Sequence, residues 1–482
     1  TGIENTAVGT SAMLGNQPGS YNTGIGSYAL QFSQSNGNTA IGSQAMFLTN
    51  SGNQNTAVGA SAMFLNTTGS GNVAIGVNTM EKNTTGYSNV AVGMNALSKN
   101  TNRNNLVAIG DSALFNNGTG SMTSTSGTGN TAVGSKALYL NTSGQENSAF
   151  GFNALFNNTS GLRQTAIGYE ALYNNIDGDY NAALGYNSMF QNTSGSYNAS
   201  FGNFSLYNNV SGLYNAAFGY AALNNNTTAD NNSAFGNLSL AANTTGADNA
   251  SFGHYALRNN VNGNQNSAFG TQALSVSLGF SNTAIGYQSL FKNSAGNNNT
   301  AVGAYADVSI SNLTNATAIG YTAKVTQSDA MMFGNVQVNK WGFGVTPGAN
   351  RALQVGTDAS NGNGAYLTSA GVWTNVSDKN KKEDFTGING NELLNKIASL
   401  PITRWKYKGS NEYHIGPMAQ DFYALFNVGN DDKSISTIDP AGIALAGVQQ
   451  LKKENDELKG KNVGLTEMYR ELLKRIEKLE NK

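Results

Sequence analysis

A short apolar run that ends in glycine recurs through the first two thirds of the chain. It is present at Asn38–Gly42 as Asn-Thr-Ala-Ile-Gly, and it returns with small changes as far as Gly320. Most steps between copies are 17 residues, two are 16, and one of 24 contains an insertion from Asn117 to Gly129. The nineteen copies end at Gly9, Gly26, Gly42, Gly59, Gly76, Gly93, Gly110, Gly134, Gly151, Gly168, Gly185, Gly202, Gly219, Gly236, Gly253, Gly270, Gly286, Gly303 and Gly320. A period this regular predicts a stack of one repeated unit.

The unit from Gln164 to Tyr180 shows the pattern within one repeat. Thr165–Ile167 is typical of a short strand, Ala171–Tyr173 of a second one, and Asn174–Asp179 of a turn. Two short runs and one turn predict a flattened, two-sided parallel β-roll, or solenoid, whose coils lie about 4.8 Å apart. Nineteen such coils would form a rod on the order of 90 Å long. The fold class is therefore mainly β.

Both faces of the first run are apolar. Ile167 points to one side, while Ala166 and Gly168 point to the other. A strand that is apolar on both faces is buried on both, yet so thin a roll has a single interior. We therefore expect identical chains to pack together, as a trimer. The small Ala/Gly side would allow another backbone to approach closely.

Side chains of one type also recur in phase with the repeat. One row holds asparagines (Asn141, Asn158, Asn175, Asn192, Asn209, Asn226, Asn243 and Asn260) and another holds aromatic residues (Tyr139, Phe156, Tyr173, Phe190 and Tyr207). Stacked amides bond along a fibre and stacked rings pack. The aromatic row could instead be a sugar-binding stripe. A structural role is favoured, because the rings stop at Asn224 while the asparagines continue.

These repeats resemble the head of trimeric autotransporter adhesins. Those heads are trimers of left-handed parallel β-rolls with a similar valine/alanine-isoleucine-glycine motif. The resemblance covers roughly residues 1–335, and Ala318–Gly334 resembles the way in which such rolls end. It implies a trimeric rod; the handedness of this roll does not follow from its sequence.

Composition narrows the possible functions. Only 11% of residues are charged and the net charge is −1, which argues against binding nucleic acid or an anionic membrane. Cysteine is absent, which excludes disulfides and thiolate metal sites, and no apolar run is long enough to span a bilayer. Neither a metal nor another cofactor is indicated.

The chain begins inside a repeat at Thr1, so we expect it to be a fragment or processed form whose anchor lies upstream.

The rod offers little for catalysis. A polysaccharide-degrading tailspike would need paired carboxylates that face one bond. Only Asp177 and Asp179 are close neighbours, and two acids beside Gly178 are typical of a solvated turn rather than a calcium site. His254 follows a repeat glycine and is expected at the surface. The rod is therefore expected to be non-catalytic.

The pattern changes after Gly334. Trp341–Gly348 and Ala352–Gly356 indicate short strands, Asn391–Leu400 has helical spacing, and Ile402–Lys408 alternates as a strand. A charged run begins at Ser377. From the motif alone, Ser377–Asp378 is best explained as a turn or helix cap, although Lys382 could serve as the base that activates Ser377 as a nucleophile.

A wider set of motifs resembles the intramolecular chaperone domain of endosialidases and other phage tail fibres. It comprises Ser377–Asp378 with Lys382, the run His414–Phe422, and Ile435–Asp439 before a terminal coiled coil. The resemblance implies that the domain trimerises, drives folding of the upstream β-structure and then cuts the chain between Ser377 and Asp378. It makes Ser377 the nucleophile and Lys382 the base, and it assigns His414, Gly416, Ala419 and Gln420 to the chaperone motif.

Heptads follow this domain. Leucines recur every seven residues (Leu451, Leu458, Leu465, Leu472 and Leu479), and a second row holds Val448, Asn455, Asn462, Tyr469 and Ile476. This spacing predicts a coiled coil in which the two asparagines set the register. Fixing three chain ends together would prevent out-of-register pairing of near-identical coils.

The predicted organisation is a β-roll rod (1–335), a β connector (336–376), a chaperone domain (377–445) and a trimeric coiled coil (446–482). We predict a homotrimeric fibre, extracellular on a virion or phage-like tail particle, that attaches to a cell-surface receptor or glycan. The alternative is a bacterial cell-surface adhesin built from the same parts; a polysaccharide-degrading tailspike is disfavoured. The insertion 117–129 is a candidate recognition loop, although an insertion without a role is the simpler explanation.

Overall fold

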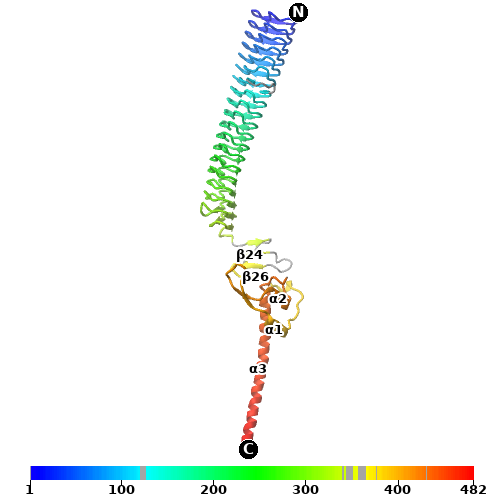
Figure 1. Ribbon diagram of the computed structural model, residues 1–482, viewed down its shortest axis with the longest axis vertical. Coiled ribbons are helices and arrows are strands. Elements are labelled where there is room, and N and C mark those ends of the chain that lie inside the picture. Colours follow the sequence, from blue (N-terminus) through cyan, green and yellow to red (C-terminus); the bar gives the residue numbers. More distant parts are fainter. Residues whose placement is uncertain are drawn as a thin grey trace. The chain divides into compact units, whose positions relative to one another are not determined.

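The computed structural model describes residues 2–119, 126–338, 341–343, 351–355, 365–375, 377–429 and 431–481. The chain forms two compact units, Thr1–Asn339 and Lys340–Lys482. In the first unit, the coils stack one on another along its length (Figure 1). The fold is mainly β and consists of a long parallel β-solenoid, a small region of sheet and helix, and a C-terminal helix.

The solenoid contains one parallel sheet of 20 strands, each of which is three residues long. Each strand pairs in register with its counterpart one coil away; Thr165, for example, lies opposite Ala182. The strands are β1 (Thr6–Val8), β2 (Thr23–Ile25), β3 (Thr39–Ile41), β4 (Thr56–Val58), β5 (Val73–Ile75), β6 (Val90–Val92), β7 (Val107–Ile109), β8 (Thr131–Val133), β9 (Ser148–Phe150), β10 (Thr165–Ile167), β11 (Ala182–Leu184), β12 (Ala199–Phe201), β13 (Ala216–Phe218), β14 (Ser233–Phe235), β15 (Ala250–Phe252), β16 (Ser267–Phe269), β17 (Thr283–Ile285), β18 (Thr300–Val302), β20 (Thr317–Ile319) and β22 (Met331–Phe333).

The predicted second strand of each unit is wrong for most of the solenoid. Residues Ala171–Tyr173 belong to a turn segment, residues 169–174, in which Glu170 and Leu172 have φ of 51° and 53°. A β-branched residue is strongly disfavoured at positive φ. The position of Leu172 accordingly holds leucine or methionine in every coil from Met13 to Leu290. These side chains point inward and fill the core.

The last coils do form the second strand. The core leucine is replaced by Asp307 and then by Lys324, each followed by a valine. There β19 (Asp307–Val308) pairs in parallel with β21 (Lys324–Val325). Neither Asp307 nor Lys324 has a positive φ. The extended conformation thus appears where β-branched residues replace the usual sequence.

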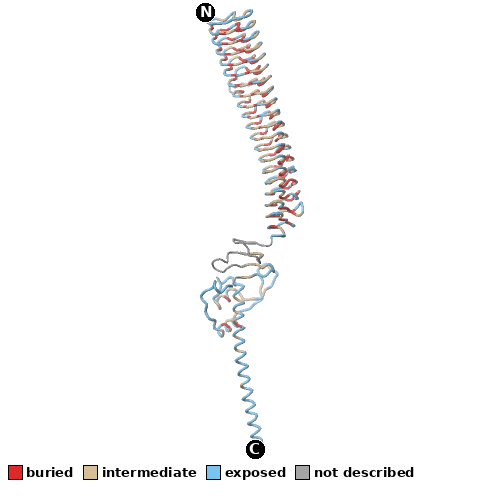
Figure 2. Tube along the Cα trace, turned by 180° about the vertical axis from the view of Figure 1, so that it is seen from behind, coloured by how far each residue is buried: buried red, intermediate tan, exposed pale blue. Residues whose placement is uncertain are grey.

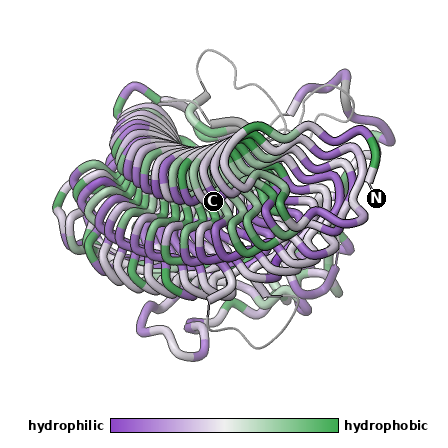
Figure 3. Tube along the Cα trace, turned by 90° about the horizontal axis from the view of Figure 1, so that it is seen from above, coloured by the Kyte–Doolittle hydropathy of each residue, from purple (hydrophilic) through white to green (hydrophobic). Residues whose placement is uncertain are grey.

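The interior of the coil is lined by small residues of the strand, contrary to the expectation that the Ala/Gly side faces another chain. Ala166 is completely buried against Ala171 and Leu172, whereas Ile167 remains 41% exposed. The buried positions therefore form a continuous column inside the stack (Figure 2). Seen along the stack, hydrophobic and hydrophilic positions recur at the same place from coil to coil (Figure 3).

Two rows of buried asparagines complete the interior. In the first row, Asn175 Nδ2 donates to Asn158 Oδ1 of the neighbouring coil at 2.7 Å and to Gly178 O at 3.1 Å. In the second row, Asn181 Oδ1 accepts the backbone N–H of Asn198 at 3.0 Å. The amides thus bond between coils in both rows, and in the first row they also bond within their own coil. Buried polar groups are costly unless they are bonded in this way.

The second unit contains a four-stranded sheet and the helices of the C-terminal region. The sheet has the order β23 (Trp341–Phe343), β24 (Arg351–Val355), β25 (Ala365–Thr368) and β26 (Trp373–Asn375), of which only the β23–β24 pair is parallel. The strands predicted near Trp341 and Leu353 are therefore present. The elements that follow are the 3-10 helix η1 (Lys379–Lys381), α1 (Gly390–Ser399), β27 (Thr403–Trp405), β28 (His414–Gly416), α2 (Ala419–Phe426) and α3 (Asp439–Glu480).

The repeat glycines determine how closely coils can stack. Gly168 has φ of +134°, and a Cβ there would lie 2.4 Å from Gly185 O. Gly168→Ala should therefore lower the free energy of unfolding by at least about 3 kcal/mol, through backbone strain and this clash. The urea midpoint of the full chain, followed by circular dichroism, measures the loss.

Gly71→Asn is the matched control for this substitution. Gly71 also has a positive φ, of +68°, but a Cβ there would lie 4.0 Å from its nearest neighbour, Ser88 Oγ. Asparagine tolerates this left-handed conformation, and the change should stay within about 0.5 kcal/mol. Equal midpoints for the two variants would contradict the role of the glycine column.

Candidate functional site

A single turn brings Ser377 and Lys382 together at the start of the predicted chaperone domain (377–445), called the C-terminal domain from here on. The Asp378 carboxylate accepts the backbone N–H of Asn380 at 2.9 Å and so caps η1. The turn closes when Lys382 N donates to Lys379 O at 3.2 Å. Lys382 Nζ then lies 2.6 Å from Ser377 Oγ. The predicted serine–lysine pair is therefore within hydrogen-bond distance.

A hydrogen bond joins these two side chains: Lys382 Nζ donates and Ser377 Oγ accepts. A nucleophilic serine needs a neighbouring base that accepts its proton. Both side chains are exposed, as is Asp378. The separation of Ser377 Oγ and Lys382 Nζ is short enough for direct proton transfer between them.

The other predicted motif residues belong to a separate cluster. His414 begins β28 and lies opposite Trp405 of β27, with ring centroids 4.8 Å apart. Gly416 ends the same strand, opposite Thr403. Ala419 and Gln420 form the first turn of α2. Among the residues that the structure describes, no hydrogen bond or ring contact joins this cluster to Ser377 or Lys382.

One feature of this cluster was not anticipated from the sequence. The Arg404 guanidinium lies over the Tyr413 ring at 4.0 Å, and Lys406 Nζ is 5.7 Å from the same ring. The alternation of Arg404, Trp405 and Lys406 in a strand was the available signal, because alternate side chains share a face. The partner Tyr413 could not be identified without the pairing of β27 with β28.

The C-terminal domain has a very small core. Leu393 of α1 and Phe422 of α2 are the buried apolar side chains among its described residues. Helix α1 packs on α3, where Gly447 leaves room for Ile397. Gln450 Nε2 also donates to Asn391 Oδ1 at 2.6 Å. These contacts attach the first turns of α3 to the domain.

The acids and the histidine singled out in the rod have structural surroundings. Asp179 Oδ1 accepts the backbone N–H of Leu162 from the adjacent coil at 2.8 Å, so it caps a neighbouring turn. Asp177 is exposed. His254 is also exposed, and its ring lies 3.7 Å from that of Tyr255. Within the described ranges, no cluster of three or more His, Cys, Asp or Glu side chains could hold a metal ion.

The insertion 117–129 is anchored at both ends, and residues 120–125 lie outside the described residues. Asn117 Nδ2 donates to Gly127 O at 2.9 Å, across the base of the insertion. This redirects Asn117 away from the amide row, so that Asn100 Oδ1 has no partner. The row resumes when Asn141 Nδ2 donates to Asn117 Oδ1 at 2.8 Å. The recognition role of the insertion stays a prediction.

Comparison with known families identifies the C-terminal domain. Residues 377–428 match the family model described as Chaperone of endosialidase. The chain therefore carries a domain of this family after a β-solenoid of about nineteen turns, as the sequence motifs predicted. A chaperone of this family combined with a long β-solenoid fits a phage tail-fibre type protein. A search of curated proteins found no match for the chain. None of the helices described is long and apolar enough to cross a membrane.

Proposed function

We propose that three copies of this chain form a fibre that attaches to a cell surface as part of a phage or phage-like tail. In this proposal, the C-terminal domain directs trimer folding and then cuts the chain between Ser377 and Asp378. The observation that carries the proposal is an apolar column, unpartnered in the single chain, in each of the two units. Both columns repeat at a fixed period along the sequence.

The column on the solenoid comes from the third residue of each strand. Ile167 and its equivalents point away from the interior, and most are 36–56% exposed. Five phenylalanines of this column, from Phe201 to Phe269, stack at 4.6–4.8 Å. Monomeric soluble proteins rarely expose a continuous apolar surface of this size. Two further copies of the same column are the partners that match its length and period.

The column on α3 is the heptad seam. Leu451, Leu458, Leu465, Leu472 and Leu479 are 54–73% exposed in the single chain. A 42-residue helix with this spacing is stabilised by burying the seam against equivalent helices. Asn455 and Asn462 occupy two of the five positions in the second row of the seam. Polar residues at such positions specify register at some cost in stability.

An assembly of this kind needs its chains aligned at one end. Because successive coils are nearly identical, a shift by one coil leaves most contacts between chains intact. Joining three C-terminal domains first would place the three last coils at equal height. The small core around Leu393 and Phe422 supports such a role, since association would bury further surface of a domain that buries little by itself.

Cleavage would follow assembly. In the proposed reaction, Lys382 accepts the proton of Ser377 Oγ as this oxygen attacks the carbonyl carbon of the Ser377–Asp378 bond. The C–N bond breaks, and Lys382 passes the proton to the departing amine of Asp378. One water molecule then hydrolyses the ester, which restores the serine hydroxyl and leaves a carboxylate at Ser377. Release of the domain would make assembly of the rod irreversible, because a rod that came apart would no longer carry the element that aligns its chains.

The oligomer prediction uses two lysine substitutions on α3. Leu465 and Glu467 are both exposed in the single chain, but only Leu465 lies on the seam. Leu465→Lys should abolish the trimer, whereas Glu467→Lys should leave it unchanged, because like charges are buried only in the first variant. Light scattering on the uncleaved protein should give three times the 50.3 kDa chain mass for the wild type. A wild-type monomer, or equal behaviour of both variants, would refute the trimer.

The cleavage prediction concerns the serine–lysine pair. Ser377→Ala and Lys382→Ala should each slow cleavage by at least about 100-fold, because each removes a proton-transfer partner. Intact mass should show fragments that end at Ser377 and begin at Asp378 in the wild type. Lys379→Ala, which changes an exposed lysine in η1, is the control and should still be cut. A wild type that stays whole in the trimer, or a cleaved Ser377→Ala variant, would overturn the mechanism.

A further inference from the structure

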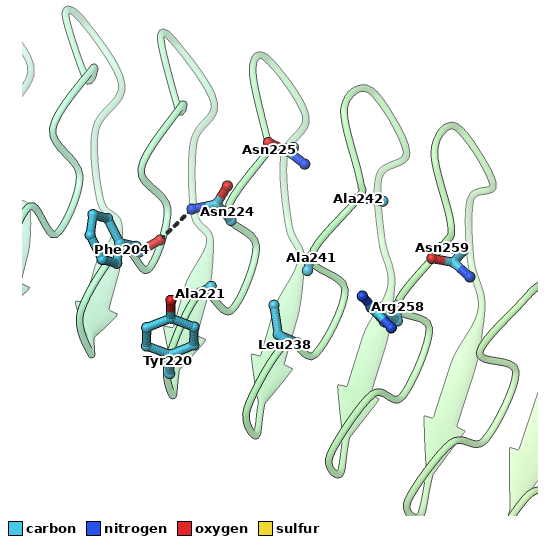
Figure 4. Close-up of a pocket in the computed structure, with 10 residues that line it drawn as sticks. All are labelled: Phe204, Tyr220, Ala221, Asn224, Asn225, Leu238, Ala241, Ala242, Arg258 and Asn259. Carbon is cyan, nitrogen blue, oxygen red and sulfur yellow. Dashed lines mark hydrogen bonds between the residues drawn. The ribbon is translucent and has the colours of Figure 1, made fainter.

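The flank of the solenoid has a hollow where its regular side-chain rows stop. We call it the flank hollow; it has a volume of about 460 Å³. Its lining consists of Phe204, Tyr220, Ala221, Asn224, Asn225, Leu238, Ala241, Ala242, Arg258 and Asn259. These residues come from four successive coils (Figure 4). None of them belongs to a strand, so the flank hollow is distinct from the apolar column proposed for trimer contacts.

The hollow exists because the aromatic row is interrupted. Rings stack from Phe115 through Tyr207, with centroids 5.1–5.3 Å apart. The next two positions of the row hold Asn224 and Ala241, and the third holds Arg258. Two missing rings leave space over Ala241, which is 7% exposed. Phe204 and Tyr220 form an aromatic wall beside this space, with their rings edge to face at 6.0 Å.

A second row ends at the same place. Amide side chains along the flank bond from coil to coil, and the last bond runs from Asn208 Nδ2 to Asn225 Oδ1 at 3.0 Å. The following position is Ala242, which offers no acceptor. Asn225 Nδ2 points toward Ala242, into the hollow (Figure 4). The interruption of the row thus leaves an amide donor available to a ligand.

The charge of the hollow is positive. Arg258 is held over the Tyr255 ring at 4.6 Å, and no carboxylate among the described residues pairs with its guanidinium. None of the lining residues is acidic. An arginine fixed in this way binds carboxylates in a bidentate fashion. Asn224 is already engaged, since its Nδ2 donates to Phe204 O at 2.9 Å, but its Oδ1 remains as an acceptor.

We propose that the flank hollow binds a carboxylate-bearing saccharide. Aromatic faces contact the apolar C–H faces of sugars, amides bond to hydroxyls, and Arg258 pairs with the carboxylate. The hollow is open and extends over three coil steps, about 14 Å, which suits a linear chain of sugars rather than a compact ligand. The inference rests on the proposed attachment role, because that role supplies a surface saccharide to bind.

The test uses the full-length fibre and an immobilised panel of alginate, polygalacturonate and hyaluronan oligosaccharides. Each is presented beside its carboxyl-reduced, neutral counterpart. The wild type should bind one or more of the acidic forms in preference to the neutral form. Arg258→Gln should weaken that binding about tenfold, because it removes a charge-assisted contact, and should leave binding of the neutral form unchanged.

A pair of phenylalanine substitutions tests whether the hollow itself is the site. Ala241→Phe returns a ring to one of the two interrupted positions and fills the space; the fold accepts it, because Phe156 and Phe190 occupy the same repeat position. It should abolish binding. Ser98→Phe places the same side chain at that repeat position in a distant coil and should bind as the wild type does.

Three results would overturn the inference. They are a wild type that binds no acidic saccharide, unchanged binding by Ala241→Phe, and equal losses on acidic and neutral forms in Arg258→Gln. Light scattering on the same preparations separates this inference from the proposed function. A trimer that still attaches to cells through another surface rejects the hollow alone, whereas a monomer that attaches to none rejects the attachment fibre as well.

Discussion

Direct stacking of backbone on backbone between successive coils is the constraint on which the solenoid depends. At Gly168 the chain passes so close to Gly185 that no side chain fits, and the same contact recurs from Gly9 to Gly303. Once the backbones are this close, every interior group must repeat in phase. Alanine lines the strand, leucine or methionine fills the centre, and asparagines bond both within and between coils. Where Ser200 replaces a strand alanine, its hydroxyl pairs with that of Ser188 at 2.8 Å, so the interior stays satisfied.

The same stacking leaves an apolar column of the single chain uncovered. A coil this thin encloses only one side of its strand, so Ile167 and its equivalents form a column that faces outward along the whole stack. The helix α3 repeats the situation with its leucine seam. Both columns are long and regular. On α3, Asn455 and Asn462 can set the register of the seam, but successive coils of the solenoid are nearly identical and offer no unique alignment between chains. A separate domain that aligns three ends is the simplest solution to that difficulty, and a chaperone-of-endosialidase domain lies between the two columns in the sequence.

The sequence predicted the architecture well, because the period is a direct record of the stacking. It predicted the pairing partners, the first of the two amide rows and the motifs of the C-terminal domain. It was wrong where local geometry depends on φ: Leu172 was assigned to a strand, although the lack of any β-branched residue at that position indicated a left-handed conformation. The side of the strand that faces the interior was also assigned wrongly, since alternation distinguishes two faces but not which of them is inside. The proximity of Ser377 Oγ and Lys382 Nζ required the η1 turn, and the flank hollow required knowing which rows lie side by side.

Disulfide trapping across the outward column tests the central claim most directly, because the natural chain contains no cysteine. Ile167→Cys places one thiol on the column, and Asn174→Cys places one in the turn segment of the same unit, outside the strand. If three columns meet along a common axis, mild oxidation of the Ile167→Cys protein gives covalent dimers on a non-reducing gel, while the Asn174→Cys protein stays monomeric on the gel. If the Ile167→Cys chains do not cross-link, or if both variants cross-link equally, the column is not the contact between copies and the account of the fibre is contradicted.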